Sequence, residues 1–139
     1  GNVAPEVAKL VQVTKECFFK GLEQAVVGNH ISDIGRAIQQ HAESHGYGVV
    51  RELVGHGIGM NMHEAPEVPN YVIPHFGRGA RLVPGMAIAI EPMINLGTRR
   101  IRVLDDGWTC VTADGKPSAH YENTIFISEN GPEVLTNPE

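Results

Sequence analysis

The chain has 139 residues, of which 42% are hydrophobic and 19% are charged, a composition typical of one globular domain with a single core. Its formal net charge of −5 argues against partners that bind through phosphates, because such binding depends on an excess of lysine and arginine. Its apolar runs are too short to cross a bilayer. We therefore expect one domain over residues 1–139, with no membrane span and no direct nucleic-acid binding.

Two helices are predicted in the first third of the chain. Between Pro5 and Val27, apolar residues recur at the three- and four-residue spacing of a helix with one buried face. Pro5 suits the first turn, and Gly28 can end the helix. Ser32 is the predicted N-cap of the second helix. The inner face of this helix is predicted to contain Ile34, Ala37, Ile38 and Ala42, with His41 or His45 as further candidates.

Beyond Gly48 the pattern changes to short segments bounded by glycine, proline and asparagine, which is typical of strands. Strands are predicted at residues 57–62, 86–91, 101–104 and 121–128, and glycine-containing turns suit antiparallel neighbours. Residues 66–84 are rich in proline and glycine and are predicted to form a surface loop. We therefore predict an α+β fold in which two helices pack on a mostly antiparallel twisted sheet.

The two cysteines and the basic cluster do not indicate a functional site. Cys17 and Cys110 fall in different predicted elements and are too few for a disulfide framework, so we expect both to be reduced. The basic cluster of Arg99, Arg100 and Arg102 is interpreted as the solvated edge of a hairpin.

His56 is surrounded by Gly55, Gly57 and Gly59. Glycine in a strand often marks a place where another group approaches the backbone closely, so the segment is consistent with the wall of a functional site. A glycine-rich turn that carries a hydrogen-bonded histidine explains the same residues, and the segment alone does not separate these interpretations. In a straight strand, His56 and His63 would point to opposite faces, so they need not share a role.

Two glutamates lie at unusual positions in apolar segments. Alternation places Glu91 on the same face as Ala87 and Ala89, and it places Glu122 on the same face as Thr124. Glu91 alone is better explained as a charge at a strand end. Together with His56, however, they form a set of oxygen and nitrogen ligands suited to Mn(II), Fe(II), Co(II) or Zn(II).

These motifs, in this order, resemble the C-terminal half of the type I methionine aminopeptidases, which belong to the pita-bread metallopeptidases. The resemblance covers essentially the whole chain. It is carried by the helix pair and by the segments Gly55-His56-Gly57-Ile58-Gly59, His63-Glu64, Ile90-Glu91-Pro92-Met93, Asp106-Gly107-Trp108 and Tyr121-Glu122.

The resemblance implies removal of the initiator methionine from nascent chains and peptides by an enzyme with two divalent metal ions (Co, Mn, Fe or Zn). By motif, the metal ligands are His56, Glu91 and Glu122, and Glu91 also carries a proton to the leaving amine. His63 is expected to be catalytic and to contact the substrate amide. The methionine pocket is expected to involve Met62 and Trp108; His120 is assigned only proximity to the site.

Two departures from the family pattern affect these expectations. Met62 stands where the family usually has phenylalanine, which alters the expected shape of the pocket. The family's two metal-binding aspartates precede the helix pair, so we expect them in an N-terminal half that must accompany this chain, and we expect the 139 residues alone to be inactive. The alternatives are a non-catalytic pita-bread scaffold that binds protein partners and a mononuclear metalloprotein that uses His56, Glu91 and Glu122.

Overall fold

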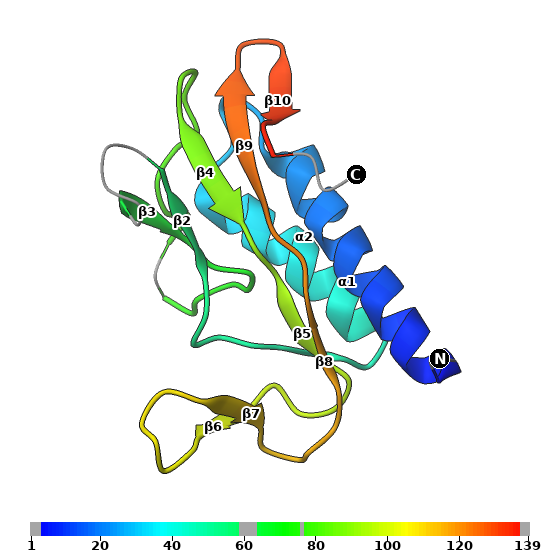
Figure 1. Ribbon diagram of the computed structural model, residues 1–139. Coiled ribbons are helices and arrows are strands. Elements are labelled where there is room, and N and C mark those ends of the chain that lie inside the picture. Colours follow the sequence, from blue (N-terminus) through cyan, green and yellow to red (C-terminus); the bar gives the residue numbers. More distant parts are fainter. Residues whose placement is uncertain (1–3, 59–63, 76, 137–139) are drawn as a thin grey trace.

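The computed structural model describes residues 4–58, 64–75 and 77–136. Two helices, α1 (Pro5–Gln24) and α2 (Ile31–Ser44), precede a series of short strands. Figure 1 shows the helices side by side, with the strands extending past them. The strands are β1 (Gly48–Val49), β2 (Gly55–Gly57), β3 (Glu64–Val68), β4 (Ala87–Ile90), β5 (Met93–Asn95), β6 (Ile101–Val103), β7 (Cys110–Thr112), β8 (Ser118–His120), β9 (Asn123–Ser128) and β10 (Gly131–Val134).

The helices form where their periodicity predicts them, but their ends differ from the prediction. Helix α1 ends at Gln24, short of the predicted Val27, and Ala25 N–H donates to Leu22 O in the last turn. The prediction that Ser32 caps α2 is wrong. His30 is the N-cap, and its backbone N–H donates to Asp33 Oδ2 at 2.8 Å as part of a capping box.

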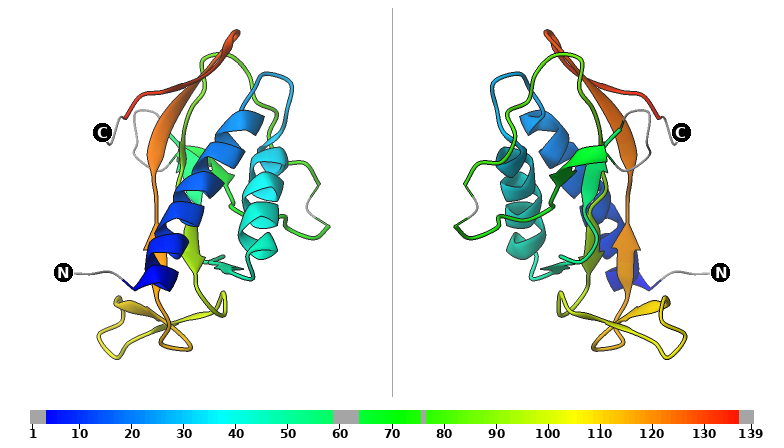
Figure 2. Two further views of the ribbon diagram at one scale, coloured as in Figure 1. Left: turned by 90° about the vertical axis from the view of Figure 1, so that its right-hand side faces the viewer. Right: turned by 90° about the vertical axis from the view of Figure 1, so that its left-hand side faces the viewer.

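The core lies between the helix pair and one face of the largest sheet. Figure 2 shows both helices on the same side of the strands. Gly21 allows the helices to approach closely, because a Cβ at this position would lie 3.0 Å from Ile38 Cδ1. Within the described residues, no helix is both long and apolar enough to cross a membrane. The fully buried side chains of this core include Leu10, Phe18, Ile34, Ile38, Ile88, Ile90, Ile125 and Ile127.

Every strand pair in the described residues is antiparallel, and together these pairs form three sheets. The largest has the order β10-β9-β4-β2-β3, the second has the order β1-β5-β8, and β6 pairs with β7 alone. The α+β prediction is confirmed. The prediction of a surface loop over residues 66–84 is wrong in part, because β3 extends to Val68, and because Val68, Asn70 and Leu82 are completely buried.

The β6–β7 hairpin projects from the rest of the molecule (Figure 1). Its turn includes Gly107 at φ 85°, a left-handed conformation that favours glycine. Arg100 and Arg102 are exposed at this hairpin, as predicted for a solvated edge. Both cysteines are free, Cys17 in the core and Cys110 at the surface.

Candidate metal centre

Strand register brings His56, Glu91 and Glu122 together from three parts of the chain. On one side, His56 of β2 lies opposite Ala89 of β4. Ala89 precedes Glu91 by two residues, so Ala89 and Glu91 lie on the same face of the sheet. On the other side, Ile90 of β4 pairs with Asn123 of β9. Extending this antiparallel register by one residue places Glu91 opposite Glu122. The two glutamates and the histidine therefore share one face of the sheet.

The two glutamates lie where paired strands pass from the largest sheet into the second sheet. Figure 1 shows β4 continuing into β5, and β8 continuing into β9. Glu91-Pro92 joins the first two strands, and Tyr121-Glu122 joins the other two. Pro92 has no N–H to offer the ladder, but its carbonyl accepts from Tyr121 N–H at 3.1 Å. The two strands therefore remain hydrogen-bonded where they pass from one sheet into the other. This pairing holds the carboxylates of Glu91 and Glu122 next to each other.

The ligand atoms of His56, Glu91 and Glu122 all lie within 4.8 Å of one another. His56 Nε2 is 3.2 Å from Glu91 Oε2, a buried oxygen that accepts no hydrogen bond within the described residues. Burying a carboxylate oxygen without a donor is costly. A divalent cation between these atoms would satisfy this oxygen, so the donor set fits the metal that the motifs predict.

The electrostatics of the site also favour a cation. Burial raises the pKa of Glu91, and the neighbouring Glu122 carboxylate raises that pKa further, whereas His56 lowers it. Two carboxylates in close proximity repel each other unless a proton or a metal neutralises part of their charge. In addition, His56 Nδ1 lies 3.2 Å from Gly57 O. In the tautomer that donates Nδ1–H to this carbonyl, Nε2 on the Glu91 side of the ring is the nitrogen that can bind a metal.

Asn70 is a residue of this site that the sequence did not reveal. Its side chain is completely buried, and its Nδ2 donates to the backbone carbonyl of Glu91 at 3.2 Å. This bond holds the backbone of Glu91 in place beside its metal-binding side chain. Asn70 lies in the segment predicted to be a surface loop, where a single asparagine between prolines gives no periodic signal. By contrast, His120 was expected near the site, and its Nε2 lies 4.0 Å from Glu91 Oε1.

Comparison with known proteins identifies the family. The sequence pattern of metallopeptidase family M24 matches residues 1–129. The chain belongs to metallopeptidase family M24. The histidine and the two glutamates therefore converge in a member of a metallopeptidase family.

Several proteins with similar sequences are methionine aminopeptidases. The chain is 58% identical over 136 residues to the methionine aminopeptidase of Clostridium perfringens, covering 98% of this chain and 54% of that protein. It is 48% identical to methionine aminopeptidase 1 of Bacillus subtilis, with the same two coverages. The crystal structure of the Thermotoga maritima methionine aminopeptidase superimposes with a TM-score of 0.92 at 44% identity, covering 99% of this chain and 54% of that chain. The chain thus spans about half the length of these relatives.

These similarities confirm the resemblance drawn from the motifs, and the fold is confirmed as half of a pita-bread fold. A prolidase from Pyrococcus furiosus shares the fold alone, with a TM-score of 0.75 at 23% identity.

The remaining predicted site residues are not tested by this geometry. Met62 and His63 lie outside the described residues. Trp108 is in the turn between β6 and β7 with 80% of its surface exposed. Its assignment to a methionine pocket stays a prediction, and such a pocket would need to cover this exposed ring with another part of the protein.

Proposed function

We propose that the full-length protein containing this chain is a cytoplasmic, metal-dependent aminopeptidase that removes methionine from the N-termini of nascent proteins and peptides. The observation that carries this proposal is the convergence of His56, Glu91 and Glu122, with ligand atoms within 4.8 Å of one another. The identity to methionine aminopeptidases over 98% of the chain supports the choice of substrate.

In this proposal, His56, Glu91 and Glu122 hold part of a pair of divalent ions, which are Co, Mn, Fe or Zn. Since the chain covers 54% of its relatives, we assign the remaining ligands to an N-terminal half of the same domain. A divalent metal bound there would lower the pKa of its water to about 7 and would polarise a carbonyl, which would supply a nucleophile at neutral pH. The isolated 139 residues are expected to bind metal weakly and to lack measurable turnover.

The chain's own residues provide the proton transfer and the oxyanion contact. Glu91 accepts a proton from the attacking water and passes it to the leaving amine, a role typically worth about 10²- to 10⁴-fold in rate. His63 donates a hydrogen bond to the negative charge that develops on the carbonyl oxygen, and Met62 and Trp108 contact the methionine side chain.

Metal binding and turnover can be separated by two variants of the full-length protein. We expect Glu122→Ala to lose metal, because it removes a ligand. We expect His63→Ala to keep metal but to lose about 10²- to 10³-fold in turnover, as for loss of one oxyanion donor. Isothermal titration with Co²⁺ and hydrolysis of a Met-Gly peptide measure the two quantities.

Metal stoichiometry at this centre separates the proposal from its alternatives. Two ions bound together with hydrolysis would support the aminopeptidase. One ion without hydrolysis would instead identify a mononuclear metalloprotein, and no bound ion would identify a non-catalytic scaffold. Equal loss of metal in His63→Ala and Glu122→Ala would refute the separate roles of these residues.

A further inference from the structure

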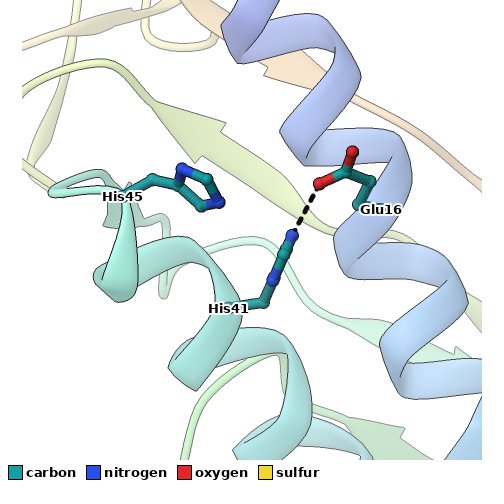
Figure 3. A group of neighbouring side chains, drawn as sticks. All are labelled: Glu16, His41 and His45. Atoms are coloured by element: carbon teal, nitrogen blue, oxygen red, sulfur yellow. Dashed lines mark hydrogen bonds and ion pairs between the residues drawn. The ribbon is translucent and has the colours of Figure 1, made fainter.

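A second cluster of metal-ligating side chains lies between the two helices and shares no residue with the centre described above. Glu16 comes from α1, His41 comes from the last turn of α2, and His45 is the C-cap of α2. One ligand atom from each residue lies within 4.8 Å of the other two. Figure 3 shows Glu16 and His41 pointing toward one another across the helix pair, with the His45 ring turned toward the same gap.

We propose that Glu16, His41 and His45 form a second binding site for a divalent transition metal, such as Zn²⁺ or Cu²⁺, which links α1 to α2. Two imidazoles and one carboxylate are a ligand set that zinc takes in proteins, with a fourth position open to water. Imidazole nitrogen also favours copper and nickel over magnesium or calcium. This proposal does not depend on the aminopeptidase activity.

The spacing of the ligands requires only small side-chain movements. With metal–ligand bonds of about 2.1 Å, neighbouring ligands in a tetrahedral site lie about 3.4 Å apart. Glu16 Oε1 and His41 Nε2 are 2.8 Å apart, and they must separate slightly to admit an ion. Positions four residues apart on a helix share one face, which explains why His41 and His45 have ring centroids only 5.0 Å apart.

Neighbouring groups hold the ligands in orientation. Gln12 donates to Glu16 Oε2 at 3.2 Å, which leaves Oε1 directed at His41. The His45 ring stacks on Tyr47, with centroids 5.9 Å apart and an interplanar angle of 22°. Hydrogen bonds from His41 and Gln12 lower the pKa of Glu16, so its carboxylate is anionic at neutral pH.

The surroundings of the cluster are compatible with a bound cation. A surface hollow of about 320 Å³ borders His41, and its described lining includes neither Glu16 nor His45. Its described lining includes Lys20 and Glu23, whose opposite charges offset each other. The dipole of α2 also places partial negative charge at the C-terminal end of the helix, which stabilises a cation near His45. His45 is exposed, so metal can reach it from solvent.

Zinc stoichiometry tests the proposal in the full-length protein. Isothermal titration with Zn²⁺ would compare the wild type with His45→Asn and Glu16→Gln. The matched control is His75→Asn, which removes an exposed histidine at φ 63°, a conformation that asparagine tolerates. We expect one equivalent of zinc to bind about tenfold more weakly, or not at all, in both cluster variants, compared with the wild type and the control. Methionine peptide hydrolysis should be unchanged in His45→Asn.

Copper spectroscopy supplies an independent result. The cluster offers two imidazoles, whereas the ligands from this chain at the first centre include one, His56. Electron paramagnetic resonance of the Cu²⁺-loaded wild type should therefore show a species coupled to two imidazole nitrogens, which disappears in His45→Asn. Because His45 is exposed and outside the helix, this variant should unfold at the wild-type temperature. Equal zinc stoichiometry together with equal zinc affinity in all four proteins would overturn the proposal, and so would the absence of a two-imidazole copper species in the wild type. Either result would mean that Glu16 and His41 form only an ion pair between the helices.

Discussion

Gly55, the residue before the His56 ligand, provides a sharp test of how strand packing positions the metal centre. Gly55 is buried in β2, beside β4, which leads to Glu91. A Cβ at this position would lie 2.1 Å from the carbonyl oxygen of Ala89, and 3.1 Å from Val68 Cβ. Because both neighbours belong to the sheet, a Gly55→Ala side chain cannot be accommodated by rotating a flexible group.

The size of the effect follows from this distance. Ordinary contact begins at 3.4 Å, so β2 and β4 must separate by about 1.3 Å, the difference between 3.4 and 2.1 Å. Overpacking typically costs about 1–3 kcal/mol, and each strained or lost backbone hydrogen bond adds about 0.5–1.5 kcal/mol. We therefore expect Gly55→Ala to lower the free energy of unfolding by about 2–5 kcal/mol.

The same displacement moves His56 away from Glu91, because these residues are held together by the β2–β4 register. We expect metal affinity at the first centre to fall about 10- to 100-fold, as for the loss of a group that orients a ligand. Thermal unfolding would show a melting temperature lower by about 4–20 °C, and isothermal titration with Co²⁺ would give the affinity.

Gly115→Asn is the control, because Gly115 has φ +74° and a Cβ at this position would meet nothing within 4 Å. The Gly115→Asn substitution should lower the free energy of unfolding by less than about 1 kcal/mol, since asparagine tolerates this conformation. Wild-type stability together with wild-type metal affinity in Gly55→Ala would refute the link between this contact and the centre.

Three further predictions concern the helices and their core. Phe18→Ala should lower the free energy of unfolding by about 3–5 kcal/mol in denaturant titrations, since this ring is completely buried. Asp33→Ala should cost about 1 kcal/mol by the same measurement, because it removes the bond to the His30 N–H. Burial raises the pKa of the Cys17 thiol to about 12 from an ordinary 9.0, so native protein at pH 8 should be alkylated at Cys110 but not at Cys17. The stability contributed by this retained proton should be complete below pH 9 and should decline as pH rises toward 12, which denaturant titrations at several pH values would detect.

Local sequence patterns determined the helices and the faces of the main strands. The three- and four-residue spacing around Leu10 and Phe18 identified the buried face of α1, since helical periodicity depends on neighbours in the chain. Alternation likewise placed Ile88 and Ile90 in the core, with Ala89 and Glu91 on the opposite face. The chemical types of the ligands were also visible, because a histidine among glycines and glutamates in apolar strands are unusual.

Only the tertiary structure decided that His56, Glu91 and Glu122 lie within bonding reach of one position. The number of residues between them in the sequence does not give their distance in space. Alternation along a strand identifies the face on which a residue lies, but it does not identify the neighbouring strand. The β2–β4 and β4–β9 registers supply that information, because antiparallel pairing fixes which residues lie opposite each other. Long-range packing likewise buried Asn70 and joined Glu16 to His41, contacts between residues far apart in sequence that no local period encodes.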